Sequence, residues 1–257
     1  MNTKIMNEAL KLLTDKYAVT SGTLVSANGV YKVRRDGAED HDVLPWRVER
    51  RFTELKKMID TGTLEDVSTL RFASFASEGK SIEALLAREI DLAQWLIESP
   101  VKRIFAVCSP GYKTVSAILK FENEMSASIE CSVGLPAGAM PMDRHEIIAR
   151  RGVASDRVVD TQVPQASIYL FNEDGERRYT DVDAELFGLA EEDIWTVRAA
   201  FAVLAKPQTT TNWNASAVKM NMLAKAAIDS DRSETPVVFT NAENIFSTVK
   251  IQKRSLS

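Results

Sequence analysis

The chain has 257 residues, of which 45% are hydrophobic and 26% are charged, and its formal net charge is −4. A chain of this length and composition can bury an ample core as one large domain or two modest ones, without a metal or disulfide staple. The small acidic excess argues against a nucleic-acid or membrane-surface role, because such roles favour a basic face.

The two histidines and two cysteines show no metal-ligand spacing, so we expect no metal site. Cys108 and Cys131 lie in apolar runs and are predicted to be buried thiols in a reducing compartment. The first residues form an amphipathic run without a long apolar core, and nothing in the chain approaches membrane-spanning length. We therefore expect a cytoplasmic protein.

The first 45 residues predict a helix, a hairpin and a linker. Apolar residues recur at helical spacing from Ile5 to Leu13. The dipeptide Asn28-Gly29 then separates two extended runs, which is a strong signal for a tight hairpin. A polar, turn-rich stretch, "RRDGAEDHDVLPW", follows as a loop or linker.

Two further helices enclose a predicted strand. Pro45 can open the first of them at its first position, and Gly62 can cap its C-terminus. The segment "VSTLRFASFA" predicts a strand. Ser81 then begins a helix with a long apolar side, and Ser99-Pro100 ends it.

The apolar period changes to two after that helix. The stretches "TVSAILKF" and "MSASIECSV" alternate apolar with polar residues, and the short link "ENE" predicts that they pair as an antiparallel hairpin. The remaining predicted strands are "RHEIIAR", "DRVVDTQ", "ASIYLF" and "PVVF", and the remaining predicted helices are 191–205 and 213–228.

This order of elements predicts an α+β fold, with a large, mostly antiparallel sheet and helices packed on one face. The other face carries small and polar side chains. A broad sheet face of this kind often meets a copy of itself, so we expect a homo-oligomer.

Four stretches together resemble a known family. They are 46–72, 89–107, 116–132 and 209–239, and their order and spacing are similar to the substrate-binding half of the Gfo/Idh/MocA oxidoreductases, the relatives of glucose–fructose oxidoreductase and inositol dehydrogenase. The resemblance implies that residues 46–257 form that family's C-terminal α+β domain, and that residues 1–45 are a separate N-terminal segment.

The resemblance also implies a division of labour. The family binds NAD or NADP on an N-terminal Rossmann domain, while the second domain binds a sugar or polyol and forms oligomers through its open sheet. Here none of the eleven glycines forms a G-x-G-x-x-G pattern after a strand. We therefore expect no nucleotide cofactor on this chain alone. Residues 1–45 are either a Rossmann remnant or an unrelated appendage, and the Asn-Gly hairpin favours the appendage.

The family's proton-transfer helix is altered as well. Its pattern D-x-x-x-H-x-x-D places three residues on one stripe of the helix. When the last aspartate is aligned on Asp91, the other two positions hold Ala84 and Arg88. Alanine cannot accept a proton, and arginine stays charged at any useful pH. We expect Asp91 to form a local ion pair with Arg88 rather than a catalytic contact.

Six residues are candidates for ligand binding. His145 begins a strand, where a surface or capping role is the commoner one, and Trp95 can either pack or stack on a sugar ring. The arginines around His145 favour a charged, exposed sheet edge over an anion site. The candidates are Arg88, Asp91, Trp95, His145, Gln162 and Gln165.

Three hypotheses for function follow. The first is a degenerate relative that serves in binding, regulation or assembly. The second is an oxidoreductase whose nucleotide domain is supplied by a Rossmann-domain partner or lies outside this sequence. The third is a protein that binds or transforms a sugar-like ligand without a nicotinamide.

Overall fold

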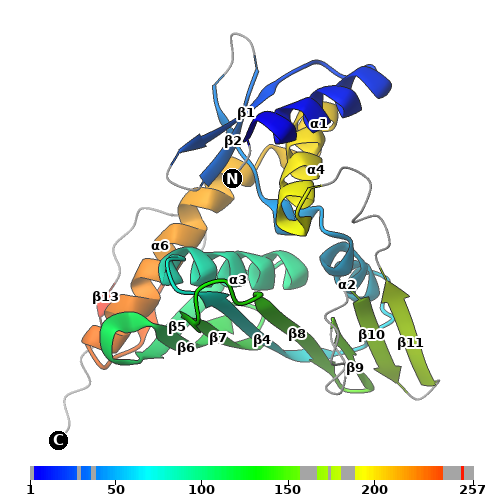
Figure 1. Ribbon diagram of the computed structural model, residues 1–257. Helices are drawn as coiled ribbons and strands as arrows, with labels where there is room; N and C mark the ends of the chain where they lie inside the picture. The colour runs from blue at the N-terminus through cyan, green and yellow to red at the C-terminus, as the bar shows by residue number, and fades with distance from the viewer. Residues whose placement is uncertain are drawn as a thin grey trace, which may run out of the picture. The chain divides into compact units, whose positions relative to one another are not determined.

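The structure is a computed structural model that describes residues 3–27, 30–35, 39–156, 167–172, 175–180, 189–239 and 250–251. The chain divides into two compact units (Figure 1). Unit 1 comprises residues 1–53 and 181–218, and unit 2 comprises residues 54–180 and 219–257. The boundary expected between residues 45 and 46 stays a prediction. It marks where the resemblance to the family begins, whereas the two units are defined by how compactly the chain is packed.

Unit 1 contains a short antiparallel sheet and the helices that pack with it. The expected hairpin forms, because β1 and β2 pair antiparallel with Ala27 opposite Val30, although Asn28 and Gly29 lie outside the described residues. The predicted linker contributes a two-residue strand, β3, that pairs with β2. Its elements are α1 (Thr3–Lys16), β1 (Thr23–Ala27), β2 (Val30–Arg34), β3 (His41–Asp42), the 3₁₀ helix η1 (Pro45–Arg47), α4 (Glu191–Ala205) and α5 (Pro207–Thr210).

Unit 2 is built on one large sheet. Its strands follow the order β11-β10-β9-β8-β4-β7-β6-β5-β12-β13. They are β4 (Val67–Ser77), β5 (Val101–Cys108), β6 (Thr114–Phe121), β7 (Ser126–Leu135), β8 (Met142–Ala149), β9 (Gly152–Ser155), β10 (Ser167–Asn172), β11 (Gly175–Thr180), β12 (Val237–Val238) and β13 (Lys250–Ile251).

The pairing confirms the predicted α+β fold. The strands β6 and β7 form the expected hairpin, with Ala117 opposite Ile129. Among the described strand pairs of this sheet, β4 with β7 is parallel and the others are antiparallel. The sequence prediction missed β9 and β11, which are short and lack a clear alternation of apolar residues.

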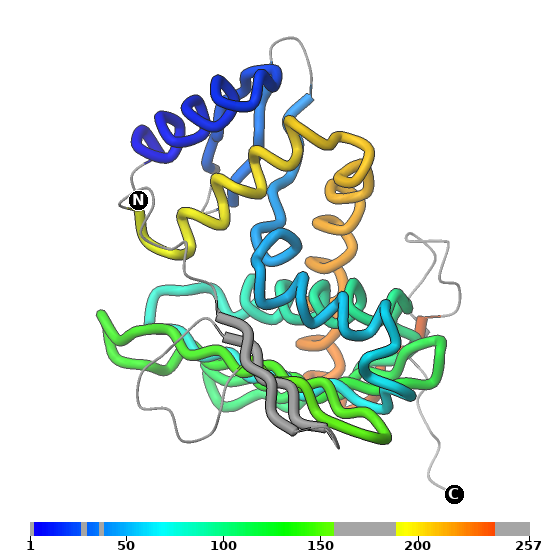
Figure 2. The backbone as a smooth tube through the Cα atoms, turned by 90° about the vertical axis from the view of Figure 1, so that its right-hand side faces the viewer, coloured from blue at the N-terminus to red at the C-terminus, as the bar shows by residue number. Residues whose placement is uncertain are grey.

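Helices cover one face of this sheet. Figures 1 and 2 show α3 (Ile82–Ile97) lying across the central strands. The helix α6 (Trp213–Arg232) is tied to β5, because the Ser230 hydroxyl accepts from the Ala106 amide at 2.8 Å and the Asp231 carboxylate accepts from the Cys108 amide at 2.9 Å. These side-chain contacts join α6 to the sheet at a strand that has only the short β12 on its other side.

The sequence of α3 explains its position. Its apolar residues from Leu86 to Leu96 are buried, and the Ser81 hydroxyl caps its first turn by accepting from the Ala84 amide at 3.2 Å. Glu98 ends the helix in a left-handed conformation, one residue before the Ser99-Pro100 pair that predicted the end. The helix α2 (Arg50–Asp60) begins later than expected, because η1 takes up Pro45.

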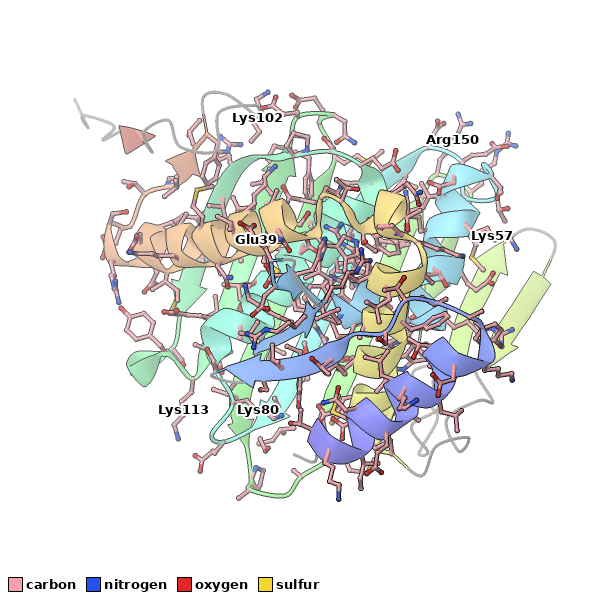
Figure 3. The ribbon with its side chains drawn as sticks, turned by 90° about the horizontal axis from the view of Figure 1, so that it is seen from above. Glu39, Lys57, Lys80, Lys102, Lys113 and Arg150 are labelled. Carbon is pink, nitrogen blue, oxygen red and sulfur yellow. The ribbon has the colours of Figure 1, made fainter. Side chains whose placement is uncertain are left out.

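The remaining periphery of unit 2 is charged and solvated. Figure 3 labels Lys102, Lys113 and Arg150, which form exposed ion pairs with Glu124, Glu78 and Asp66 at 2.8, 2.6 and 3.0 Å. Exposed pairs of this kind contribute little to stability. The 3₁₀ helix η2 (Pro110–Tyr112) connects β5 to β6. Cys131 is buried as expected, and Cys108 is partly exposed.

The cap of α3 gives a simple stability test. Replacing Ser81 with alanine removes the acceptor for the Ala84 amide without opening a cavity, because Ser81 is exposed. We expect a loss of about 1 kcal/mol in the free energy of unfolding, measured by urea denaturation. Ser81→Asp should retain the cap and serve as the matched control. Equal midpoints for the alanine and aspartate variants would contradict this assignment.

Candidate functional site

The three residues aligned with the family pattern on α3 differ in how far they are exposed to solvent. Ala84 is exposed, the Arg88 side chain is 24% exposed, and Asp91 is 2% exposed. The helical period that buries Leu86, Ile90 and Ala93 also turns Asp91 inward, which is why this carboxylate lies in the protein interior.

Arg88 is held by two carboxylates. Its Nε donates to the Glu89 carboxylate at 2.7 Å, and one terminal nitrogen lies 2.9 Å from Asp143 on β8. The same nitrogen donates to the Ser74 hydroxyl at 3.2 Å, and that hydroxyl donates to Asp143 at 2.7 Å. The ion pair expected between Arg88 and Asp91 stays a prediction, since the contacts described above join Arg88 to Glu89 and Asp143.

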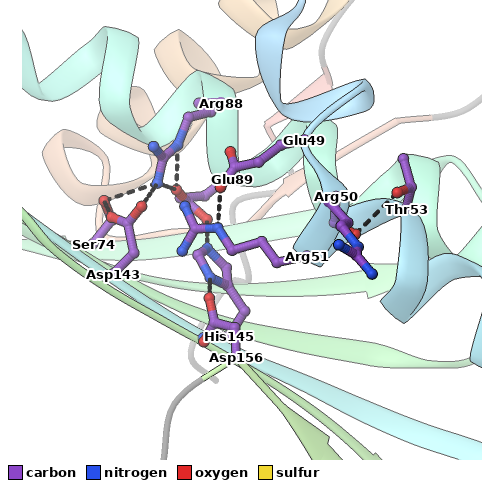
Figure 4. A network of polar contacts seen from close by, with 10 residues as sticks. All are labelled: Glu49, Arg50, Arg51, Thr53, Ser74, Arg88, Glu89, Asp143, His145 and Asp156. Atoms are coloured by element: carbon purple, nitrogen blue, oxygen red, sulfur yellow. Dashed lines mark hydrogen bonds and ion pairs between the residues drawn. The ribbon is translucent and has the colours of Figure 1, made fainter. Parts of the chain in front are cut away.

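His145 continues the same polar network into the core (Figure 4). Its Nε2 lies 2.9 Å from a Glu89 oxygen and its Nδ1 lies 2.5 Å from an Asp156 oxygen. The His145 amide also donates to Asp156 at 2.6 Å. All three side chains are essentially inaccessible to solvent. The expectation of a surface or capping histidine is therefore wrong, because the β8 register turns this side chain toward α3.

The electrostatics of this network follow from burial and pairing. Burial by itself lowers the pKa of His145, but the charges and hydrogen bonds of Asp156 and Glu89 outweigh it and raise that pKa to about 9. Burial by itself raises the pKa of Glu89, but Arg88 and His145 hold it below its ordinary value. The histidine is thus an imidazolium at neutral pH that donates from both ring nitrogens.

Asp91 belongs to a second group of polar residues on α3 and α6. Lys219 on α6 is half-buried, and this burial lowers its pKa while the charge of Asp91 partly offsets the effect. Trp95 follows Asp91 on the same side of α3, is partly exposed, and has the Lys56 ammonium 5.8 Å from its ring centroid. This group offers a carboxylate, an amine and an aromatic ring.

The other candidates do not join these groups in the described part of the chain. Gln162 and Gln165 lie outside the described residues, as does Arg157. Arg144 does not lie on a sheet edge, because β8 has β4 and β9 on either side, and it pairs with Glu146. The exposed-edge interpretation was therefore wrong for Arg144.

Five residues of these networks were not among the candidates. Glu89 had a signal in the sequence, since a charge lies on the apolar side of the helix that carries Leu86 and Ile90. The other four are brought in by strand register and helix packing, which the local sequence does not specify. They are Ser74, Asp143, Asp156 and Lys219.

The described residues of unit 1 do not fit a dinucleotide. A pyrophosphate needs a glycine-rich turn from a strand into a helix N-terminus within a parallel βαβ unit. The strands β1, β2 and β3 instead pair antiparallel. At Gly22, the position of an added Cβ lies 2.8 Å from a Leu204 methyl carbon, so packing against α4 accounts for this glycine.

Within the described ranges, no group of three histidine, cysteine, aspartate or glutamate residues could hold a metal ion. A search of the same residues finds no helix that is both long and apolar enough to span a bilayer. Among the described residues of unit 2, Asp91 and Lys219 are a carboxylate and an amine whose charges interact.

Comparison with known proteins confirms the fold. No protein-family model matches the sequence, and no curated protein matches it. Solved structures of dehydrogenases do match, and they share the α+β fold with its large, mostly antiparallel sheet, so the resemblance is confirmed at the level of the fold.

Three of these structures illustrate the similarity. Myo-inositol 2-dehydrogenase from Lactobacillus plantarum has a TM-score of 0.55 at 18% identity, covering 77% of this chain and 64% of that one. A levoglucosan dehydrogenase in complex with NADH and levoglucosan has a TM-score of 0.58 at 14% identity, and the match covers 76% of this chain and 64% of that one. Scyllo-inositol dehydrogenase from Lactobacillus casei, with NAD(H) and scyllo-inositol, has a TM-score of 0.54 at 16% identity, and the match covers 76% of this chain and 63% of that one.

The chain spans only part of each of these proteins. It covers between 61% and 64% of the length of the matching structures named here and of an oxidoreductase from Thermotoga maritima. At these identities the similarity shows the fold alone.

Because His145 is buried and charged, we expect the free energy of unfolding to depend on pH. Because the folded-state pKa of about 9 exceeds the ordinary value of 6.5, the stabilisation is complete below pH 6.5 and is lost as pH rises through 9. The loss should be on the order of 3 kcal/mol in unfolding free energy, measured by denaturation between pH 6 and 10. An imidazole NMR titration should show His145 still protonated at pH 8.

Asp156→Asn supplies the matched control for this prediction, because it keeps the size of the side chain and removes one of the two carboxylates that charge the histidine. Its stability should depend less on pH over the same window. If the variant and the original protein lost stability in parallel, the assignment of a buried imidazolium would be wrong.

Arg88 should matter for folding. Replacing it with methionine leaves the buried Glu89 and the partly exposed Asp143 without this guanidinium, and we expect a loss of roughly 3 kcal/mol. Lys57→Met, which removes an exposed cation from α2, should cost less than about 1 kcal/mol. Thermal and urea denaturation of both variants provide the measurement, and similar losses for the two would refute the proposed role of Arg88.

Proposed function

We propose that this chain is a degenerate relative of the polyol dehydrogenases that binds a sugar-like or polyol ligand and does not transfer hydride by itself. The observation that carries the proposal is Arg88. It occupies the stripe position where the resemblance implies a proton-transferring histidine, and it is held there by Glu89 and Asp143.

An arginine in this position is poorly suited to acid–base chemistry. The guanidinium keeps its proton at any useful pH, and its ion pairs with two carboxylates stabilise the charged form further. The histidine of unit 2, His145, has both ring nitrogens hydrogen-bonded to carboxylates and no exposed surface. Neither side chain is positioned to exchange a proton with a bound alcohol.

The ligand class is supported by the polar groups that remain. Asp91 and Lys219 can hydrogen-bond to vicinal hydroxyls, and the partly exposed ring of Trp95 can pack against a sugar. Proteins with this fold include one crystallised with levoglucosan and one with scyllo-inositol. A polyol is therefore the ligand to test first, with Asp91, Trp95 and Lys219 as its contacts.

A second candidate is an oxidoreductase completed by another polypeptide that carries a Rossmann domain. It is favoured by one observation: the chain covers only 61% to 64% of the length of dehydrogenases with the same fold. In that case NAD or NADP would bind to the partner, and Asp91 with Lys219 would face the substrate.

The first experiment is a thermal-shift and calorimetric screen of the purified chain against NAD, NADP, myo-inositol, scyllo-inositol and levoglucosan. We expect stabilisation by a polyol and none by either nucleotide, because a ligand stabilises only the state that binds it. Trp95→Ala should weaken the polyol response by about tenfold, whereas Lys57→Met should leave it unchanged.

Turnover provides the decisive outcome. NAD(P)H formation, followed by absorbance with the same polyols, should stay at background, while a myo-inositol dehydrogenase run in parallel serves as the positive control. Steady NADH production by this chain alone would overturn the proposal. Activity that appears only after addition of a separate Rossmann-domain protein would favour the second candidate.

A further inference from the structure

We propose that Lys219 is a nucleophile that binds a sugar-like ligand covalently, through an imine between its side-chain nitrogen and a carbonyl carbon of the ligand. The inference rests on the proposed function for the place where the ligand binds. It narrows the ligand from any polyol to a polyhydroxy aldehyde or ketone. It also assigns to α6 a reaction that proceeds without a nicotinamide.

Lys219 lies on the inner side of α6. Leu223 and Ala226 follow it by one turn and two turns on the same stripe of the helix, and both are buried. The stripe continues to Ser230, whose hydroxyl accepts from the amide of Ala106 in the sheet. Lys219 itself is only partly exposed. Its side chain is therefore largely removed from water, but its nitrogen is not sealed off from a ligand.

The nitrogen of Lys219 also lacks the partners that hold several other lysines. Lys57, Lys102 and Lys113 form ion pairs with carboxylates at 3.8, 2.8 and 2.6 Å. Within the described part of the chain, Lys219 forms no ion pair and no hydrogen bond, although the charge of Asp91 acts on it. Such a nitrogen can lose its proton and offer a lone pair without first breaking an ion pair.

Burial and charge act in opposite directions on the pKa of Lys219. Burial lowers this pKa, because a half-buried ammonium group loses part of its hydration, and the negative charge of Asp91 offsets only part of the effect. The pKa of Lys219 therefore lies below the ordinary value of 10.5. The larger fraction of uncharged amine near neutral pH favours attack on a carbonyl carbon.

The reaction conserves atoms and charge. Lys219 first releases a proton to solvent, which its partial exposure allows. The uncharged nitrogen then attacks the carbonyl carbon, so that a C–N bond forms, the π bond of the C=O group breaks, and its electron pair goes to oxygen. That oxygen takes up one proton from nitrogen and one from solvent, and it leaves as water when the nitrogen lone pair forms the C=N bond. The products are a protonated imine and one water, and no oxidant or reductant is consumed.

The surroundings of Lys219 favour the protonated imine of a sugar. Asp91 is 2% exposed and its negative charge acts on the nitrogen of Lys219, and a charge in a poorly hydrated site stabilises a nearby cation more strongly than it would in water. Trp95 lies one turn after Asp91 on α3 and keeps a partly exposed ring that can pack against the carbon face of a sugar. The site thus combines a covalent anchor, a counter-charge and an aromatic surface.

Reductive trapping of the full chain tests the inference. The probe is D-glyceraldehyde with sodium cyanoborohydride near neutral pH, which converts each imine into a stable amine that peptide mass spectrometry locates. We expect Lys219 to be labelled at least about fivefold faster than Lys225, which is exposed on the same helix and serves as the matched internal control. Glycerol, which has no carbonyl group, should give no adduct. Equal labelling of the two lysines would overturn the inference.

The pH profile of the labelling provides a readout that accessibility alone would not change. Labelling of an ordinary lysine keeps rising until about pH 10, where its ammonium group loses the proton. Labelling of Lys219 should level off at a lower pH, so its advantage over Lys225 should shrink as the pH rises. An advantage that stays constant over the whole range would contradict an activated amine.

Lys219→Arg tests whether the imine contributes to affinity. Arginine keeps a cation near Asp91 and forms no imine under these conditions. The original chain should bind D-glyceraldehyde at least about tenfold more tightly than glycerol in calorimetry, whereas the variant should bind the two alike. A variant that keeps the preference for the aldehyde would refute the covalent contact.

The failure of this inference can be told apart from the failure of the proposed function. Polyol binding in the thermal-shift screen without preferential labelling of Lys219 would defeat only the imine. Preferential labelling of Lys219 in a chain that responds to no polyol would defeat only the proposed polyol ligand. If both hold, myo-inositol should slow the labelling of Lys219 and leave that of Lys225 unchanged, and a failure to do so would show that the two ligands do not share a site.

Discussion

The buried charges of unit 2 impose the strongest constraint on its structure. Glu89, His145 and Asp156 have almost no contact with solvent, and charges removed from water are tolerated only when each has a partner of opposite sign. Asp156 and Glu89 bracket the imidazolium, and Arg88 then balances Glu89. This chain of contacts joins α3 to β8 and to the residue that follows β9. A shift in the register of any of these elements would leave a buried charge without its partner.

The same constraint fixes the surroundings of Arg88. The fold of this chain is similar to that of solved dehydrogenase structures. Arg88 stands where the resemblance implies a proton-transferring histidine, and it is paired with Glu89 and Asp143. A shared fold does not transmit an activity unless the reacting side chains are also present. In the function that we propose, Asp91, Trp95 and Lys219 serve binding rather than proton transfer.

The two faces of the sheet in unit 2 differ in burial. The face toward α3 and α6 holds the core and the buried ion pairs, whereas the opposite face presents small residues around Ile118. Because side chains alternate along a strand, one strand such as β4 supplies both Phe72 to the core and Arg71 to the exposed face. Core packing and the exposed surface can therefore be altered by substitutions on separate sides of the same strands.

The sequence by itself determined the local elements of this protein. The period of apolar residues located α1, α3, α4 and the β6–β7 hairpin, since helix and strand periodicity are local properties. The same pattern led to the α+β fold, whereas the resemblance to the family, aligned on Asp91, led to Arg88. Only the tertiary structure decided the environment of His145 and the partners of Arg88. Residues 89, 143 and 156 meet because β8 lies between β4 and β9 beneath α3, and contacts between residues so distant in sequence leave no periodic signal in any one segment.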